Sequence, residues 1–541
     1  MTLNVPLSVS VDGTHITPRV SGLAFRKEAV GGLQNITLSL SAPLNTTPLT
    51  PLGKVLVMDT RSAKVIGQAD VADPGRTADQ NTGQTWSMTA FGPAAHASDI
   101  NQMLQVIDQS LDDGWRRVRR ADLAGGEIGK STKPGTDNTD AIVAHVPASK
   151  FIDPDDHIAV RYERIRDAEQ RLGRVRYDWD AGVTDTNFKV RTVAGLNNTP
   201  DGSAAKSSGW NTAGGSHTAV YTTDFTLGRN QVDLEVWFDS GLGASFQPPN
   251  DRYWASFANV IIRSVLSEKD GTDQACSSDY VEADWVIRHL LGGGWLPLYD
   301  AVNASIDTGG VFQIDQMAYP DGISPREVLD DLMALEPGYF WTTGPDITGL
   351  GYQFWWKPWP TTVRYEATLE DGGDFPTTTR ELFNRVTVRW VDKRGRPQAT
   401  KVSGVCPTLD NKGRTRRAIL DIADELGSAA NAAQLGANFL AEHMYPPNAG
   451  TLPVARPIRD LATGRMIDPH EIEPAELIRV RGIESSPDSL NASSSDGETV
   501  FRIWAMNYTS ENHTAALELD TYPRTTAQAL ANLQRRRERK R

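Results

Sequence analysis

Two carboxylates, Asp233 and Glu235, lie two positions apart in the alternating segment 232–238. Residues i and i+2 of a strand share one face and lie roughly 7 Å apart. Glycoside hydrolases use paired carboxylates near this separation, one as the acid and the other as nucleophile or base. The same pattern is typical of the polar face of a strand in an acidic chain, so we favour a structural role for this pair.

Two short triplets also suggest chemistry, and each lacks its second part. The Gly-Lys-Ser triplet at 129–131 has Ala124 where a phosphate-binding loop needs a glycine, so we expect a flexible loop at 123–140. The Asp-Thr-Gly triplet at 307–309 matches the short signature of aspartic proteases, which need two aspartates sharing one proton. No second triplet occurs, so we expect a polar turn before a strand at 311–314.

The histidines give no metal-binding signature. His470 and Glu471 begin no zinc motif, because Pro474 stands where the second histidine would be needed. The other histidines are scattered along the chain, and neither a nucleophile-elbow serine nor a peptidase-like Cys/His pair is present. We therefore expect no catalytic residue, no cofactor and no metal site, and a protein that is not an enzyme.

A group of aromatic residues offers a ligand-binding alternative. Flat aromatic faces suit the C–H surfaces of sugars, which makes a glycan-binding platform one hypothesis for Trp210, Trp237, Tyr253 and Trp254. The alternative is that Trp237 and Trp254 belong to the core of a β-sandwich. Both interpretations stay open at this point.

Length and composition predict several domains. The 541 residues are 39% apolar and 23% charged, and they include 46 Gly and 31 Pro. At about 100–200 residues per domain, roughly three to five turn-rich, mainly β domains are expected. The net charge of −13 argues against nucleic-acid binding by the main body. The exception is the cationic segment 535–541, which is either a frayed tail or an electrostatic dock for an acidic partner.

Localisation signals are sparse. No segment approaches the roughly 18 uncharged apolar residues of a membrane helix, so no membrane anchor is expected. The N-terminus lacks the basic and apolar regions of a secretory signal, which favours synthesis in a reducing cytoplasm. Cys276 and Cys406 lie too far apart in sequence to indicate a disulfide scaffold, and we expect two ordinary thiols.

The elements that must position these residues are mostly strands. Alternating segments dominate the first and last thirds, whereas 277–365 brings helices. We expect a mainly β, multidomain fold with α+β character: two barrel-like domains, an inserted β-sandwich and a smaller α/β domain. The expected boundaries are 1–167 for the first barrel-like domain, 168–275 for the sandwich, 276–375 for the α/β domain, 376–526 for the second barrel-like domain and 527–541 for the basic tail.

The α/β domain carries the clearest local signals. Ser324, Pro325 and Glu327 predict a helix start with a capping box, since the Ser hydroxyl accepts the third N–H and the Glu reaches back. An aromatic hairpin should follow. Alternation along its second strand cannot bury both Trp355 and Trp356 in one layer, so at least one of them should meet a neighbouring domain or subunit.

The end of the chain predicts a strand at 473–480 and then a hairpin that pairs 500–508 with 515–520. Together with the strand at 83–92, the helix and hairpin at 324–357, and the strand at 382–388, this order resembles the tail-hub (minor tail or baseplate hub) proteins of long-tailed bacteriophages. The insertion at 168–272 departs from the minimal pattern of that family.

The resemblance implies a structural protein of the virion tail tip, made in the cytoplasm of the host bacterium. Hub proteins of this kind assemble as homotrimers, in which two barrel-like domains per chain present six similar units to a six-fold ring. The implied partners are the distal tail protein ring, the tape measure protein and other tail-tip proteins. A host cell-surface glycan would be a further partner if the insertion attaches to the host. A receptor-binding adhesin and a tail-associated cell-wall hydrolase are the alternatives.

Overall fold

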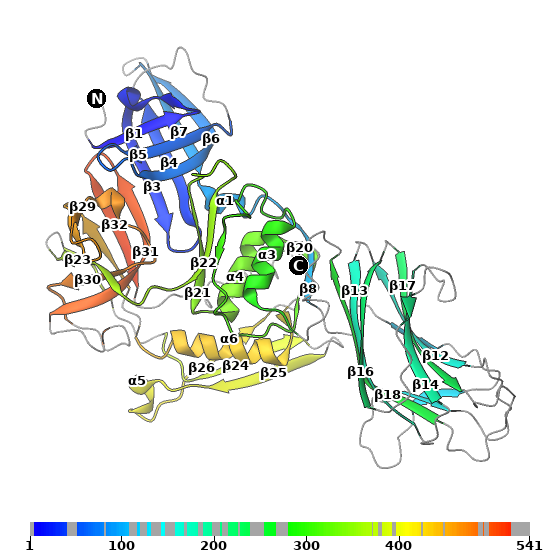
Figure 1. The fold of residues 1–541 in the computed structure, drawn as a ribbon. Helices are drawn as coiled ribbons and strands as arrows, with labels where there is room; N and C mark the ends of the chain where they lie inside the picture. The colour runs from blue at the N-terminus through cyan, green and yellow to red at the C-terminus, as the bar shows by residue number, and fades with distance from the viewer. Residues whose placement is uncertain are drawn as a thin grey trace.

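The fold is described from a computed structural model of the chain, drawn in Figure 1. Among the described residues, no helix has the length and apolar character that crossing a membrane requires. The described residues are 5–40, 51–79, 83–107, 280–369, 372–376, 381–391, 396–422, 426–446, 449–484, 491 and 497–520, together with the strands between 116 and 266.

The N-terminal module, residues 5–91, is an antiparallel sheet with the strand order β2-β1-β5-β6-β7-β4-β3. Its strands alternate between core and solvent, as a sheet with one covered face requires. In the first strand, for example, Leu7, Val9 and Val11 are buried, and the two serines between them are half-buried. The strands are β1 (Leu7–Val11), β2 (Thr14–His15), β3 (Val20–Glu28), β4 (Gly32–Leu40), β5 (Lys54–Asp59), β6 (Val65–Asp79) and β7 (Gly83–Phe91).

The C-terminal module is built around the predicted closing hairpin, which the structure confirms as the antiparallel pair β31 and β32. Strand β30 pairs with β31, and β27 pairs with β32, both antiparallel, while β23 joins β30 in parallel. The strands are β23 (Val363–Thr368), β27 (Gly450–Val454), β28 (Ile458–Asp460), β29 (Met466–Ile467), β30 (Leu477–Arg481), β31 (Glu498–Thr509) and β32 (Thr514–Asp520).

The two modules form one continuous sheet, because β3 of the first pairs with β31 of the second. Figure 1 shows the blue and red strands side by side at this junction. The combined sheet has 14 strands, and its main path runs from a free end at β2 to another at β29. The expected closed barrels are therefore not found among the described strands, and the shared sheet curves around a common apolar core.

A central α/β unit packs beside this sheet. Its helix α4 begins with the predicted capping box: Ser324 Oγ accepts a hydrogen bond from the Glu327 N–H, and Glu327 accepts one from the Ser324 N–H. The predicted aromatic hairpin is β21 paired with β22. The elements are α1 (Pro93–His96), β8 (Gln102–Ile107), α3 (Ala283–Gly292), β19 (Ser305–Ile306), β20 (Met317–Ile323), α4 (Pro325–Leu335), β21 (Tyr339–Gly344) and β22 (Gln353–Pro358).

A helical insert follows β23 and lies below the central unit in Figure 1. Its long helix α6 packs on a three-stranded sheet, and Gly436 allows close packing because a Cβ there would lie 2.8 Å from Val402 Cγ2. Ser428 caps α6 by accepting a hydrogen bond from the Asn431 N–H. The elements are β24 (Arg385–Val391), β25 (Pro397–Ser403), α5 (Pro407–Asp410), β26 (Arg417–Asp421) and α6 (Ala429–Glu442).

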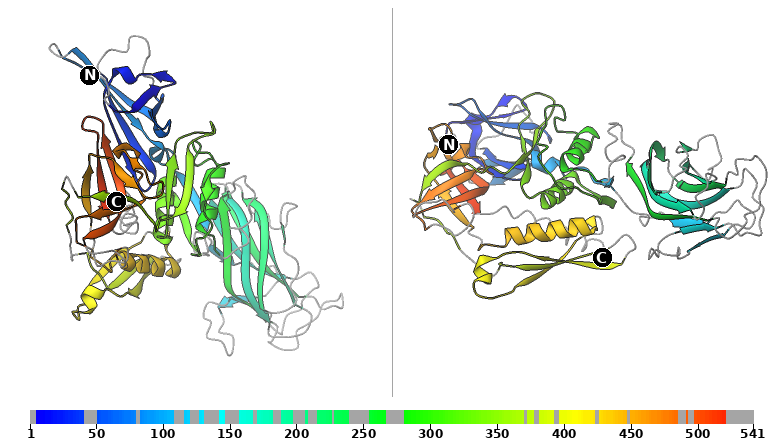
Figure 2. Two further views of the ribbon diagram at one scale, coloured as in Figure 1. Left: turned by 60° about the vertical axis from the view of Figure 1, so that its left-hand side comes forward. Right: turned by 60° about the horizontal axis from the view of Figure 1, so that its bottom comes forward.

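The sandwich lies to one side of the other units in both views of Figure 2. One of its sheets has the order β10-β11-β18-β13-β16 and the other β15-β14-β17-β12-β9. The strands are β9 (Arg116–Arg119), β10 (Glu127–Lys130), β11 (Ile142–His145), β12 (His157–Arg166), β13 (Gln170–Ala181), β14 (Phe188–Leu196), β15 (Lys206–Ser207), β16 (Gly215–Phe225), β17 (Gly228–Phe238) and β18 (Trp254–Leu266).

Strand pairing shows which sheet each segment joins. β11 and β12 pair with β18 and β17, so they belong to the sandwich and not to a first domain ending at 167. The sandwich therefore begins near 116. The helical insert has its own sheet, which separates it from the C-terminal module within the expected domain 376–526. Insertions return the chain to an earlier sheet, so segments that are neighbours in sequence need not share a sheet.

Two local expectations are also wrong. Residues 127–130 form β10 and not part of a loop, because they pair with β11. Residues 311–313 form no strand; only Ile314 makes an isolated bridge, with Val281. The Asp307 carboxylate does form the expected polar turn by accepting a hydrogen bond from the Gly309 N–H at 2.8 Å. The basic tail at 527–541 and Cys276 lie outside the described residues, and Cys406 is a buried free thiol.

Candidate functional site: the junction between the two sheet modules

Backbone hydrogen bonds set the register of the junction. β3 and β31 pair antiparallel from Ala24 opposite Thr509 to Glu28 opposite Ala505. The pairing continues past both strand ends, since the Ala29 N–H donates to the Trp504 carbonyl at 2.7 Å and Leu23 exchanges bonds with Ser510. Segments almost 500 residues apart in sequence are thus held like neighbouring strands of one sheet.

The inner face of the junction is apolar. Phe25 of β3 and Tyr508 of β31 are both buried, and their ring centroids lie 4.9 Å apart. Aromatic pairs at this separation add to the free energy already gained by burying their area. The two modules therefore share a core as well as a ladder of hydrogen bonds.

The outer face carries a charged ladder across three strands. Arg26 of β3 donates from Nη1 to Asn507 Oδ1 of β31 at 3.0 Å and to Glu518 Oε1 of β32 at 2.6 Å, and from Nε to Glu28 at 2.8 Å. The hydrogen bond to Glu518 is the main cause that raises the pKa of Arg26. The Arg26 side chain is 31% exposed and that of Glu518 is 41% exposed, so water screens this ladder.

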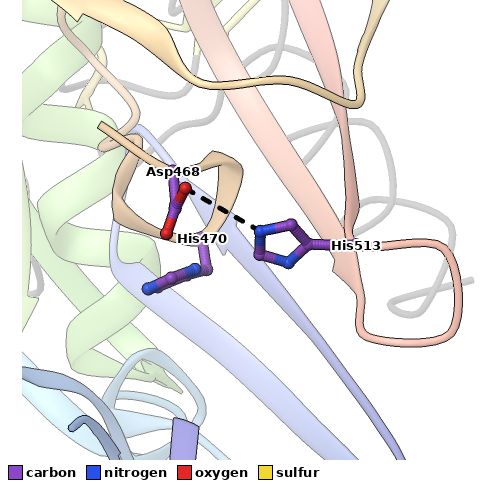
Figure 3. A group of neighbouring side chains, drawn as sticks. All are labelled: Asp468, His470 and His513. Carbon is purple, nitrogen blue, oxygen red and sulfur yellow. Dashed lines mark ion pairs between the residues drawn. The ribbon is translucent and has the colours of Figure 1, made fainter. Parts of the chain in front are cut away.

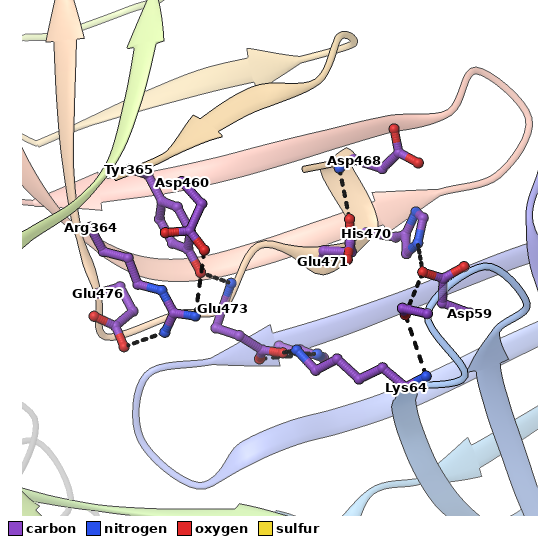
Figure 4. A network of polar contacts seen from close by, with 12 residues as sticks. Asp59, Lys64, Arg364, Tyr365, Asp460, Asp468, His470, Glu471, Glu473 and Glu476 are labelled. Carbon is purple, nitrogen blue, oxygen red and sulfur yellow. Dashed lines mark hydrogen bonds and ion pairs between the residues drawn. The ribbon is translucent and has the colours of Figure 1, made fainter. Parts of the chain in front are cut away.

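The next residue of β3 points to the other face and is buried. Lys27 Nζ lies 3.1 Å from the Glu473 carboxylate, which also receives Lys64 Nζ at 3.1 Å (Figure 4). Burial alone would raise the pKa of the Glu473 carboxyl, but Lys27 and Lys64 outweigh it and hold the pKa below its usual value. Two cations of the N-terminal module therefore converge on one anion of the C-terminal module.

A second contact has the same polarity. Arg61, in the turn after β5, forms an ion pair with Asp468, which precedes the short 3-10 helix η3 (Pro469–Glu471). Asp59 shapes that turn by accepting hydrogen bonds from the Arg61 N–H at 2.9 Å and from Ser62 Oγ at 2.7 Å. The N-terminal module thus contributes cations and the C-terminal module carboxylates, so the two faces are complementary in charge.

His470 of η3 lies at the centre of these contacts and is completely buried. Its Nε2 lies 3.9 Å from Asp59 Oδ2, and neither ring nitrogen has a hydrogen-bond partner. Burial lowers the pKa of His470 to about 4, which leaves the ring neutral at neutral pH. A buried neutral imidazole normally satisfies at least one of its two nitrogens.

His513 approaches His470 from the turn between β31 and β32 (Figure 3). The ring centroids of the two histidines lie 5.8 Å apart, and His513 Nε2 lies 3.9 Å from Asp468 Oδ1. His513 Nδ1 forms a hydrogen bond of 2.9 Å with the Tyr508 hydroxyl. One nitrogen of His513 is therefore held in place, and the other faces a carboxylate.

The polar network extends into the C-terminal module (Figure 4). The Glu473 N–H donates to the Tyr365 hydroxyl at 3.3 Å, and Arg364 donates to Glu476 at 3.0 Å. Burial raises the pKa of Tyr365, so its hydroxyl remains protonated and available at neutral pH. These contacts hold the 473–476 segment against β23, so that Glu473 is presented to the lysines in one orientation.

A cleft of about 570 Å³ opens beside Glu473, between the N-terminal module and the aromatic hairpin. Trp355 lines it together with Lys64 and Gly67, while Trp356 on the next position is buried in the central unit. This confirms that the two tryptophans serve different layers and that one of them faces another module. Trp359 is also buried, stacked on Phe340 at a centroid distance of 4.2 Å.

The glycan candidates lie elsewhere and stay predictions. Trp237 lies in β17 and Trp254 in β18, strands of different sheets of the sandwich. Trp210 and Tyr253 lie outside the described residues. Asp233 and Glu235 lie in β17, on either side of the buried Leu234.

The junction residues escaped sequence analysis for a topological reason. Lys27, Lys64 and Glu473 are ordinary charged residues, and nothing in their spacing indicates that they meet. The histidines appeared scattered, yet His470 and His513 adjoin because β32 returns the chain to η3. The sequence does place His513 in the polar turn of the closing hairpin. It does not indicate that this turn lies beside η3, which carries His470.

No protein-family model matches the chain, and no curated protein matches its sequence. Among solved structures, the chain is similar to the prophage MuSo2 43 kDa tail protein from Shewanella oneidensis (12% identity, TM-score 0.42, 97% of this chain and 99% of that one). It is also similar to a tail protein from Neisseria meningitidis MC58 (9% identity, TM-score 0.43, 97% of this chain and 98% of that one). A third similar structure is the prophage tail protein gp18 from Listeria monocytogenes EGD-e (9% identity, TM-score 0.38, 98% of this chain and 99% of that one).

The arrangement described here is suited to holding and presenting surfaces. Strand pairing, a shared core and complementary charges join the two modules. The charged groups of the junction pair with one another, whereas the buried His470 at its centre has no hydrogen-bond partner on either ring nitrogen. The class of protein that this geometry defines is a multidomain, mainly β scaffold with a laterally placed sandwich.

Proposed function

We propose that the chain is a structural subunit of a bacteriophage tail, located at the tail tip or baseplate of the virion. In this proposal three copies form a hub, and each copy contributes its two sheet modules to a ring. The ring joins the tail tube and distal tail ring to the tape measure protein and other tip proteins. Its work is shape and interface burial, without covalent chemistry.

The observation that carries the proposal is the β3–β31 pairing. It places two strand-built modules, from opposite ends of the chain, side by side within one sheet. A trimer of such a chain presents six sheet modules around its axis, which is the valency that a six-fold partner requires. Contact between a three-fold hub and a six-fold ring requires the two modules of each chain to be regularly spaced.

Exposed apolar groups offer a surface for assembly. Val302, Ile347 and Leu350 are all more than 60% exposed and lie on two adjacent loops of the central unit. The loops are fastened together, since Asp300 Oδ2 accepts a hydrogen bond from Thr348 Oγ1 at 2.9 Å and the Asp300 N–H donates to the Tyr352 carbonyl. Apolar side chains held in this way at a surface are typical of protein–protein contacts.

The test is the mass of the purified full chain, measured by light scattering alone and with the distal tail ring protein. The proposal expects a particle of three chains, either alone or only with the ring. A single chain under both conditions would exclude the hub. A double variant, Ile347→Ser with Leu350→Ser, should weaken assembly, whereas Val405→Ser, an exposed apolar residue on the helical insert, serves as the matched control.

Two further assays separate the alternatives. If the sandwich were a host-binding adhesin, the purified protein would block phage adsorption and bind host glycans. If the chain were a cell-wall hydrolase, zymography on host cell wall would show clearing. The hub proposal predicts no clearing, and it permits glycan binding only as an additional property of the sandwich.

A further inference from the structure

The cluster around His470 has an unsatisfied centre. His470 is fully buried, and both of its ring nitrogens lack a hydrogen-bond partner. A neutral imidazole has one donor and one acceptor, and leaving both unpaired inside a protein is unfavourable. A group that binds one nitrogen, and so orients the ring for the other, would remove this cost.

The neighbouring side chains are of the types that bind metals. One donor atom each from Asp468, His470 and His513 lies within 4.8 Å of the other two. Zinc binds imidazole nitrogen and carboxylate oxygen at about 2.0–2.2 Å, so donors around one ion are spaced about 3–4 Å apart. The observed group needs a contraction of at most about 1–2 Å to reach that spacing. His513 lies on a short turn, where such a shift is readily accommodated.

We propose that Asp468, His470 and His513 bind one divalent transition-metal ion, with Zn²⁺ as the best match to this donor set. Two imidazoles and one carboxylate leave a fourth position for water, as in three-ligand zinc sites. Zinc also suits the site because it prefers nitrogen ligands more strongly than Mg²⁺ or Ca²⁺ does.

The surroundings supply the orienting contacts that metal ligands usually have. His513 Nδ1 forms a hydrogen bond of 2.9 Å with the Tyr508 hydroxyl, which leaves Nε2 to face Asp468 Oδ1. Asp468 uses its other oxygen, Oδ2, for Arg61. Asp59 Oδ2 lies 3.9 Å from His470 Nε2, where it can accept the N–H of a ring whose Nδ1 binds metal. Histidine ligands commonly donate their second nitrogen to a carboxylate in this way.

The ion would fasten three segments of the junction together. Asp468 and His470 belong to the segment around η3, and His513 belongs to the closing hairpin. Asp59, through His470, connects both to the β5–β6 turn of the N-terminal module. Metal binding would therefore stabilise the contact between the modules, and the stabilisation can be measured without knowing the function of the particle.

The experiment uses the full chain, freed of any affinity tag and of bound metal by a chelator. ZnCl₂ is titrated by calorimetry, and CoCl₂ by visible absorption, which reports coordination by nitrogen and oxygen directly. The proposal expects one ion per chain, a tetrahedral Co²⁺ spectrum and a rise in melting temperature when Zn²⁺ is added.

Two variants are designed to keep the fold. His513→Asn removes the imidazole while tolerating the positive φ of 51° at this position. Asp468→Asn removes the charge while retaining a side chain that can cap η3. Each should weaken Zn²⁺ binding at least tenfold and abolish the rise in melting temperature on adding Zn²⁺, while the metal-free melting temperature falls only slightly, since each variant also loses one contact of the junction, Arg61 with Asp468 or Tyr508 with His513. His15→Asn, which removes an exposed imidazole away from the cluster, is the control and should bind as the wild type does.

Absence of Zn²⁺ binding at micromolar concentrations by the wild type would overturn the proposal. Equal affinities for the wild type and His513→Asn would overturn it as well, because binding would then be located elsewhere. Selective loss in both cluster variants, with the His15→Asn control unaffected, would support it.

Discussion

The sheet junction and the helix junction solve the same problem with different groups. At the sheet junction, backbone hydrogen bonds between β3 and β31 set the position, and charged side chains line both faces. At the helix junction, α6 of the helical insert lies on α4 of the central unit, and no backbone ladder is possible between two helices. Instead, Asn438 Nδ2 donates to the Ala334 and Leu335 carbonyls at 2.5 and 3.2 Å.

The difference teaches which groups must be buried in each case. The carbonyls that Asn438 binds belong to the last turn of α4, where intrahelical partners run out. A buried amide from another helix serves there as a cap. At the sheet junction the backbone is already satisfied, so charged side chains need only remain paired. One junction therefore depends on buried amides and the other on an apolar core with paired charges.

The largest effect should come from the apolar part of the sheet junction. Phe25→Ala removes a buried ring that packs on Tyr508, and it should destabilise the N-terminal module by about 3–5 kcal/mol. Hydrogen exchange measured by mass spectrometry should show faster exchange in both β3 and β31, with α6 unaffected.

Phe91→Ala is the matched control, because Phe91 lies in the same sheet and is 45% exposed. It should cost under about 1 kcal/mol, since little apolar area is lost from the core. If the two variants destabilised equally, the shared core would not be what joins the modules.

The next largest effect should come from removing the shared anion. Glu473→Gln leaves the buried Lys27 ammonium without its partner, and we expect a loss of about 2–3 kcal/mol, below the full cost of a buried pair because Glu473 is one-third exposed. The pKa of Glu473 is held below its usual value in the folded protein. The stability that its carboxylate contributes is therefore present above the usual pKa and is lost as the pH falls through the lowered pKa. Urea unfolding of the wild type and of Glu473→Gln at several pH values measures this loss of stability.

The control for this variant removes the cation instead. Lys27→Met keeps the apolar stem without the charge, and the double variant Lys27→Met with Glu473→Gln should recover most of the lost stability. Glu518→Gln tests the exposed face, where we expect under about 1 kcal/mol. Equal losses for Glu473→Gln and Glu518→Gln would show that burial does not distinguish the two faces.

The strands and caps could be predicted from the sequence because their signals are local. Alternation gave β31 and β32, and the Ser324 to Glu327 spacing gave the start of α4. The strands with which these elements pair could not be predicted, since the sandwich, the central unit and the helical insert all lie between β3 and β31 in the sequence. Proximity in sequence was therefore a poor guide to which sheet a strand joins.

The inner face of α6 shows a different limit. Ala433 and Ala437, whose spacing would suit an apolar helix face, are exposed. Asn431 and Asn438 are buried in their place because they bind backbone carbonyls of the central unit. A hydrophobicity pattern cannot find a face whose buried residues are polar, and for the same reason it could not find the cluster at His470.

The helix junction should respond to loss of one amide. Asn438→Ala leaves two carbonyls at the end of α4 without their donor, and we expect a loss of about 1–3 kcal/mol. Hydrogen exchange should quicken in α4 and α6 and stay unchanged in β3, the reverse of the Phe25→Ala pattern. Ala437→Ser, at an exposed neighbouring position of α6, is the control and should stay within about 0.5 kcal/mol of the wild type. Faster exchange in β3 would mean that the two junctions unfold together.

A small effect, dependent on pH, should come from His96, which joins α1 to the N-terminal module. His96 Nε2 lies 2.8 Å from Asp70 of β6, and Nδ1 lies 2.7 Å from Asp99. The contact with Asp70, and then that with Asp99, raises the pKa of His96 above its ordinary value despite partial burial. Because the folded-state pKa is raised, the ion pair contributes fully below pH about 6.5 and is lost as the pH rises through the raised value. His96→Gln should therefore cost about 1 kcal/mol at pH 5.5 and progressively less at alkaline pH, measured by urea unfolding beside His15→Gln as an exposed control. A difference in stability that stayed constant with pH would mean that His96 acts through packing. The contact between the N-terminal module and the central unit would then resemble the contact between α4 and α6, which does not depend on charge.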